Sequence, residues 1–210
     1  MLKDTRKGAY AEYLSTYILS YLGFATPVPR QEDYGIDFFC SLNYNAGDST
    51  IVGDSYAVQI KSSFKPVVYG KFKKGKWDQK QIKFLFELQV PFYFGIVDLN
   101  NDTLNLYTTS AFRFIKKEFP NCSTITFTFY EEPGGENMVH YIDQIKPIKK
   151  LKENQGDHNN YFINLRHPVL QINVKDLNDE STIDKYIKIL RMHVRMEMRN
   201  IAYDLLKWPT

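Results

Sequence analysis

The most constraining feature of this sequence is the run Phe-Tyr-Phe-Gly-Ile-Val at 92–97, which no charged residue interrupts. Pro91 stands directly before it, where it ends the helix that the pattern at 79–88 predicts. A short segment that is apolar at successive positions is typical of a central strand. The chain therefore has to build further strands beside this one and cover them with helices.

The segments on either side supply those elements. A helix is predicted over 7–22, where Ala11, Leu14, Ile18 and Leu22 recur at helical spacing and a glycine follows. Two extended stretches at 35–42 and 54–63, separated by turn-forming residues at 45–48, are predicted to pair as antiparallel strands. The remaining predicted elements are a turn at 100–102, a strand at 103–107, a helix at 110–118 and a strand at 124–130.

This order of elements predicts an α/β fold, with a mixed β-sheet core flanked by helices. The chain has 210 residues, of which 43% are apolar, enough to bury one sizeable core. We expect a domain over 1–148, followed at 149–210 by a polar linker and a helical extension. The extension is one long amphipathic helix, because apolar residues from Ile183 to Leu205 alternate by three and four.

Charge and cysteine content limit the cellular setting. A net charge of +3 is too small to imply a polyanionic partner by itself. Cys40 and Cys122 are the only cysteines, and no charged-then-apolar leader begins the sequence, so we expect a cytoplasmic protein. Apolar runs end well before the roughly 20 residues that a membrane span needs, so no membrane association is expected.

Polar residues on the two predicted strands form the candidate site. Side chains alternate along a strand, so Gln59 and Lys61 share one face while Val58 and Ile60 share the other. Asp37 lies among apolar neighbours, where a carboxylate is costly unless a cation or a donor meets it. Pairing of the strands lets Asp37, Gln59 and Lys61 converge, and the first helix can bring Glu12 to the rim of that site.

The donor set indicates which ion such a site would hold. Oxygen ligands from Asp37, from the Gln59 amide and from a strand carbonyl such as that of Ile60 suit Mg²⁺ or Mn²⁺. Glu12 would hold a water on that ion or a second ion. Zinc is not expected, because the histidines are scattered and the cysteines are far apart.

These residue types fit phosphodiester hydrolysis. The reaction needs an attacking water, a cation beside the phosphoryl oxygens and help for the departing oxyanion. Lys61 would orient the water and stabilise charge on the scissile phosphate, while Asp37 would anchor the ion.

At these residues the sequence resembles the PD-(D/E)XK nuclease superfamily. The matching motifs are Arg6-Lys7-Gly8 followed by Glu12, Gly23-Phe24, Gly35-Ile36-Asp37 and Val58-Gln59-Ile60-Lys61-Ser62. They are similar to the Gln-x-Lys (Mrr-like) branch, to an uncharacterised bacterial family and to archaeal Holliday-junction resolvases, over roughly the first half of the chain. The resemblance implies a restriction-endonuclease-like core of a helix, three strands, a helix and a strand. It also implies a magnesium-dependent endonuclease acting on DNA, in restriction or antiphage defence.

Gln59 departs from the common pattern, in which an acidic residue holds this position. An amide oxygen is a neutral and weaker ligand, so we expect lower metal affinity or a site that Glu12 completes. A catalytically inactive module that binds nucleic acid or protein is the alternative.

Lysines and aromatic residues between 61 and 77 provide a possible grip on phosphates and bases. The candidate nucleic-acid-binding residues are Lys7, Lys65, Lys71, Lys73, Lys74, Lys76 and, through the resemblance, Gln79. A solvated loop whose aromatics belong to the core explains the same lysine-rich segment equally well. The terminal helix likewise has three interpretations: packing on its own core, a homodimer interface, or an extension of the DNA-binding surface.

Overall fold

The computed structural model describes residues 2–29, 35–46, 49–63, 75–77, 79–118, 124–128, 145–147, 160–165 and 167–206. The chain divides into two compact units. The first is built from Met1–Pro66, Gln89–Tyr107 and Pro168–Thr210, and the second from Val67–Leu88 and Thr108–His167. The predicted boundary between 148 and 149 lies outside the described residues.

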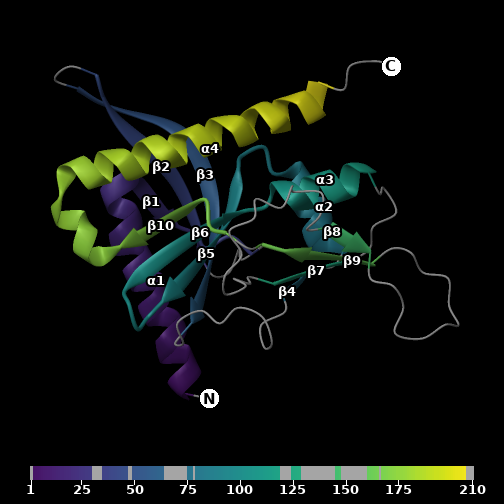
Figure 1. Ribbon diagram of the computed structural model, residues 1–210, viewed down its shortest axis with the longest axis horizontal. Helices are drawn as coiled ribbons and strands as arrows, with labels where there is room; N and C mark the ends of the chain where they lie inside the picture. The colour runs from purple at the N-terminus through teal and green to yellow at the C-terminus, as the bar shows by residue number, and fades with distance from the viewer. Residues whose placement is uncertain are drawn as a thin grey trace, which may run out of the picture. The chain divides into compact units, whose positions relative to one another are not determined.

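A six-stranded, mixed and curled sheet forms the first unit, in the order β1-β2-β3-β5-β6-β10 (Figure 1). Its strands are β1 (Gly23–Pro27), β2 (Phe38–Ala46), β3 (Ser49–Ser63), β5 (Phe92–Asp98), β6 (Thr103–Thr108) and β10 (Leu170–Asn173). β1, β2 and β3 are antiparallel neighbours, whereas β5 runs parallel to β3. β10 pairs antiparallel with β6. The predicted α/β fold is confirmed.

Every residue of β5 is buried, so the apolar run at 92–97 does form an interior strand. The predicted antiparallel pairing is confirmed between β2 and β3, although β2 begins at Phe38, so Asp37 directly precedes it. The predicted turn between them is only partly visible, since Asn45 and Ala46 end β2 and the next two residues lie outside the described part. The short strands β1 and β10 were not predicted.

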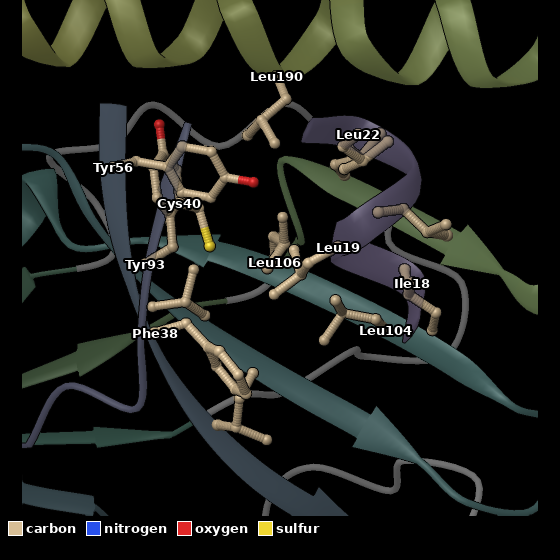
Figure 2. Packing of buried hydrophobic residues seen from close by; sticks show 14 of the residues in the cluster. Ile18, Leu19, Leu22, Phe38, Cys40, Tyr56, Tyr93, Leu104, Leu106 and Leu190 are labelled. Atoms are coloured by element: carbon tan, nitrogen blue, oxygen red, sulfur yellow. The ribbon is translucent and has the colours of Figure 1, made fainter. Parts of the chain in front are cut away.

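Two long helices pack on this sheet, α1 (Leu2–Leu22) and α4 (Glu180–Leu206). Figure 2 shows Leu190 reaching from α4 toward Leu22 and Leu19 of α1 and toward side chains of the sheet. A single buried cluster joins these residues with Phe38, Val58 and Ile60 of the strands. Of the three interpretations of the terminal helix, packing on its own core is therefore confirmed.

The start of α4 is fixed by local hydrogen bonds. A 3-10 helix, η3 (Val174–Asn178), leads into Asp179, which caps α4. Asp179 Oδ1 accepts from the Ser181 N–H at 3.1 Å, and its carboxylate also accepts from the Ser181 and Thr182 hydroxyls. The hydrogen bond from Thr182, followed by those from Ser181, lowers the pKa of Asp179.

A bulge in β3 carries the main polar contact of α4. The register pairs Ser41 with Ser55 and then Leu42 with Gly53, so Asp54 is an extra residue, with a φ of 47°. Its carboxylate accepts from Arg191 Nε at 3.1 Å and from Arg195 Nε at 3.0 Å. The Arg191 guanidinium also donates to the Asn43 carbonyl at 2.6 Å. The bulge thus turns a β-strand residue toward the helix that covers the sheet.

Cys40 lies inside the core cluster, beside Tyr56 and Tyr93, whose rings meet edge to face at 5.8 Å (Figure 2). Burial raises the pKa of the Cys40 thiol to about 12, although a hydrogen bond with Tyr56 opposes this effect. The thiol is therefore neutral at physiological pH and belongs to the packing.

The second unit holds a four-stranded sheet in the order β4-β7-β9-β8 and two helices, α2 and α3. Their bounds are β4 (Gly75–Trp77), α2 (Gln79–Glu87), α3 (Ser110–Glu118), β7 (Thr124–Thr128), β8 (Ile145–Pro147) and β9 (Asn160–Asn164). The buried Arg113 of α3 donates to the Leu85 and Leu88 carbonyls at 2.7 and 2.8 Å. It thereby satisfies the C-terminal carbonyls of α2. Among the described residues, none of the helices combines the length and the apolar character that crossing a membrane requires.

Candidate active site

Asp37 is held at the beginning of β2 by backbone contacts on both sides. Its N–H donates to the Val58 carbonyl of β3, and its carbonyl accepts from the Val28 N–H beyond β1, each at 2.9 Å. The buried side chains of Ile36 and Phe38 flank it. Asp37 directly precedes β2, and these two bonds point its N–H and its carbonyl toward opposite neighbours, so it is not part of the regular strand.

The carboxylate of Asp37 meets the backbone of β3. Its Oδ2 atom accepts a hydrogen bond from the Ile60 N–H at 2.5 Å. In an extended strand the N–H and C=O of one residue point toward the same neighbouring strand. The Ile60 carbonyl is therefore directed to the side of β3 on which Asp37 lies. This is the arrangement that a shared cation would need, and the role of Ile60 as a ligand stays a prediction.

The Gln59 side chain of β3 lies beside Gly35, two residues before Asp37. Gly35 has a φ of +89°, and a Cβ built on it would lie 3.1 Å from Gln59 Nε2. A Cβ there would crowd the amide by a few tenths of an ångström, and glycine adopts this backbone conformation without strain. The segment 35–37 and β3 thus hold each other through the Asp37 N–H on the Val58 carbonyl, the Asp37 carboxylate on the Ile60 N–H, and the Gln59 amide beside Gly35.

The faces of β3 separate the polar residues from the core. A Cβ on Gly95 would meet Ile60 and Val58 at 2.6 and 3.1 Å, so Val58, Ile60 and Gly95 lie on the core side. Gln59 and Lys61 occupy the other face, where the register places them beside Phe94 and Ile96 of β5. Gln59 is half-buried and Lys61 is exposed. The structure thus places the Asp37 carboxylate on the β3 backbone at Ile60, between Gln59 and Lys61, which share one face of that strand.

Glu12 belongs to the opposite layer. Ala11 and Ser15 of α1 are 1% and 0% exposed and face the sheet, whereas Glu12 is half-buried on the flank of that face. Its carbonyl accepts from the Thr16 hydroxyl at 2.8 Å. Its place in the site stays a prediction.

The donor chemistry fits a hard cation. In the described part of the chain, no three His, Cys, Asp or Glu side chains lie close enough to hold a metal ion. A cation at Asp37 would depend on one or two carboxylates completed by amide and carbonyl oxygens. Such ligands suit Mg²⁺ or Mn²⁺ and not zinc.

The predicted phosphate-binding residues are placed less completely. Lys65, Lys71, Lys73 and Lys74 lie outside the described residues. Lys7 belongs to α1, Lys76 to β4 and Gln79 to the first turn of α2, the last two in the second unit. Their contribution to nucleic-acid binding stays a prediction.

Two features of the site were not anticipated. The motif Gly-Ile-Asp contained Gly35, but its contact with Gln59 depends on the pairing of the strands. Phe39 shares the face of Gln59 and Lys61, and strict alternation along Phe38-Phe39 is the sequence signal that identifies it.

Comparison of this chain with protein-family models, with curated proteins and with solved structures found no match.

Proposed function

We propose that this chain is a Mg²⁺- or Mn²⁺-dependent endonuclease that hydrolyses phosphodiester bonds of DNA in the cytoplasm. The observation that carries the proposal is the hydrogen bond from the Ile60 N–H to the Asp37 carboxylate, with Gln59 and Lys61 on either side of Ile60. The order α1, β1 to β3, α2 and β5 also agrees with the core that the resemblance implies, apart from the added β4. A role in restriction or antiphage defence follows from the resemblance alone.

Each residue has a distinct task in this proposal. Asp37, Gln59 Oε1 and the Ile60 carbonyl would hold a divalent cation, which when bound would supply positive charge to the phosphoryl oxygens and acidify the attacking water. Lys61 orients that water and stabilises charge on the scissile phosphate. Glu12 supports the water or a second ion. Because Gln59 is neutral, metal affinity is expected to be lower than in a site with a second strand carboxylate.

Cleavage of supercoiled plasmid in a Mg²⁺ or Mn²⁺ titration tests the proposal. We expect metal-dependent nicking that Asp37→Ala and Lys61→Ala each reduce by at least about 100-fold, since removal of one such electrostatic contact costs about that factor. Lys175→Ala is the matched control, because Lys175 is exposed on η3, away from the two site strands. Equal nicking by wild type and both site variants would refute the assignment.

A catalytically inactive nucleic-acid-binding module is the second candidate. It is favoured by Gln59 and by the finding that no cluster of three His, Cys, Asp or Glu side chains occurs in the described part of the chain. Calorimetry with Mn²⁺ separates the two functions. Salt-dependent DNA binding without any Mn²⁺ binding supports the inactive module.

The predicted homodimer through the terminal helix also stays a proposal. The inner face of α4 packs on the core, and its outer face leaves Met192 and Met196 55% and 52% exposed. Exposed basic residues, Lys185, Lys188 and Arg199, accompany these methionines. Twofold pairing would bring these positive charges close together, so we expect any dimer to strengthen with salt.

A further inference from the structure

Two exposed phenylalanines lie on the sheet face that carries the candidate site. Phe39 of β2 is 46% exposed, and Phe24 of β1 is 58% exposed. The register pairs Phe39 with Thr26 and Phe24 with Ser41, while the alternate pair Ala25 and Cys40 faces the core. Both rings therefore project from the face opposite the core, the face of Gln59 and Lys61.

The site residues and these rings follow one line along the strands. Phe39 is two residues from Asp37, a separation of roughly 7 Å at the usual rise along a strand. On the other side of Asp37, Lys61 lies two residues beyond Gln59. A ligand laid along β2 and β3 would thus meet the Lys61 cation first, the Asp37 carboxylate next and an aromatic surface last.

Both polar and buried residues surround the rings. The hydroxyls of Ser41 and Ser55 bond to each other at 3.0 Å on this face and are solvent-exposed, whereas Ala57, which pairs with Phe39, is buried. The two exposed rings therefore offer a flat apolar surface on which a flat ligand can stack. The Lys61 ammonium on the same face can bind a phosphate. A nucleotide is the ligand that combines a negatively charged phosphate with a flat base.

We propose that Phe39, supported by Phe24, stacks on an unpaired base next to the scissile phosphate, so that the site prefers single-stranded or locally opened DNA. This inference rests on the proposed function. In a duplex each base face is covered by its neighbours, and a protein surface beside the phosphate meets only sugar and groove edges. Stacking on an aromatic side chain requires an exposed base face, which single strands, flaps and junction arms provide.

Cleavage kinetics on one labelled sequence, offered as a single strand, a blunt duplex and a duplex with a single-stranded flap, test this inference. Wild type is expected to cut the single strand and the flap at least about tenfold faster than the duplex. Phe39→Leu keeps apolar bulk but removes the ring, so KM for the single strand should rise roughly tenfold. Phe39→Trp should restore it. Tyr13→Leu is the control, because Tyr13 is an exposed aromatic residue, 77% exposed, on α1.

The outcomes separate this inference from the function beneath it. Metal-dependent cleavage that prefers the duplex, or that Phe39→Leu reduces equally on all three substrates, overturns the stacking and leaves the nuclease intact. If no substrate is cut, anisotropy of the labelled single strand decides. Binding that Phe39→Leu weakens and Phe39→Trp restores supports stacking without catalysis. If Phe39→Leu leaves the affinity for the single strand unchanged, the inference is refuted. It is also refuted if the substitution changes the sedimentation coefficient of the protein but not its affinity for the single strand, because the rings then serve another partner.

Discussion

Gly35 shows how a single residue shapes the candidate site. Any side chain at this position meets the Gln59 amide and has to adopt a φ of +89°, which L residues rarely do. We expect Gly35→Ala to lower the free energy of unfolding by about 1–2 kcal/mol. Because the new methyl displaces Gln59, it should also reduce metal-dependent cleavage by more than the loss of stability explains.

Gly8 provides the matched control for that variant. A Cβ on Gly8 would have no atom within 4 Å, and this glycine lies within α1. Gly8→Ala should therefore raise stability by roughly 0.5–1 kcal/mol, through the lower entropy of the unfolded chain. Chemical denaturation of both variants measures the difference. An unchanged stability of Gly35→Ala would contradict the steric role of Gly35.

At the scale of single residues, alternation was sufficient to place part of the site. Gln59 and Lys61 share a face because they are two residues apart on a strand, and Asp37 stands out as an acid between apolar residues. Alternation along one strand did not predict which side chains contact the neighbouring strand. The Gly35 contact with Gln59 and the hydrogen bond of Asp37 to Ile60 arise from pairing of residues 23 or more positions apart.

Among the elements, α4 is tied to β2 and β3 by polar contacts that centre on Asp54. Asp54 is 15% exposed and Arg191 is 20% exposed, so their ion pair is partly shielded from solvent. Asp54→Asn keeps a residue that tolerates positive φ but removes the charge. We expect a loss of roughly 1–2 kcal/mol in stability, since hydrogen bonds to charged groups contribute somewhat more than neutral ones.

The ion pair between Lys83 and Glu87 on α2 is the control for that loss. Its partners are 75% and 63% exposed, so Glu87→Gln should change stability by no more than about 0.5 kcal/mol. Thermal unfolding followed by circular dichroism compares the two variants. Equal losses would mean that the Asp54 contact contributes no more than a surface pair.

His193 makes the stability of α4 depend on pH. Its half-buried position lowers the pKa of the imidazole below the ordinary 6.5, and the nearby Glu197 charge opposes this shift. Above pH 6.5 the side chain is neutral in both the folded and the unfolded chain. As the pH falls below 6.5, the unfolded chain takes up the proton more readily, so the free energy of unfolding decreases.

His193→Gln should remove this part of the pH dependence, whereas Glu197→Gln should steepen it, because the charge that favours the imidazolium is lost. Urea denaturation between pH 7.5 and 5 measures both slopes against wild type. Parallel slopes for His193→Gln and wild type would exclude His193 as the source.

Helices and strands with a long hydrophobic pattern were predicted correctly. Short strands that form only through pairing with a distant strand were missed. The helices and the buried strand β5 followed from periodicity and from Pro91. β1 has five residues and contains Pro27, which an edge strand tolerates but which weakens the sequence signal. β10 has four residues, and its identity as a strand depends on pairing with β6, more than sixty positions earlier.

For the whole molecule, the first compact unit is discontinuous in sequence, because residues 67–88 and 108–167 leave it to build the second. Its sheet gains the edge strand β10 only from residues 170–173, and its core gains Leu190 and Val194 only from α4. During synthesis, residues 108–167 must therefore be made before β10 can pair with β6 and complete the six-stranded sheet. Until then β6 has an unpaired edge and Leu104 and Leu106 lack part of their cover, and both features favour aggregation of an incomplete chain.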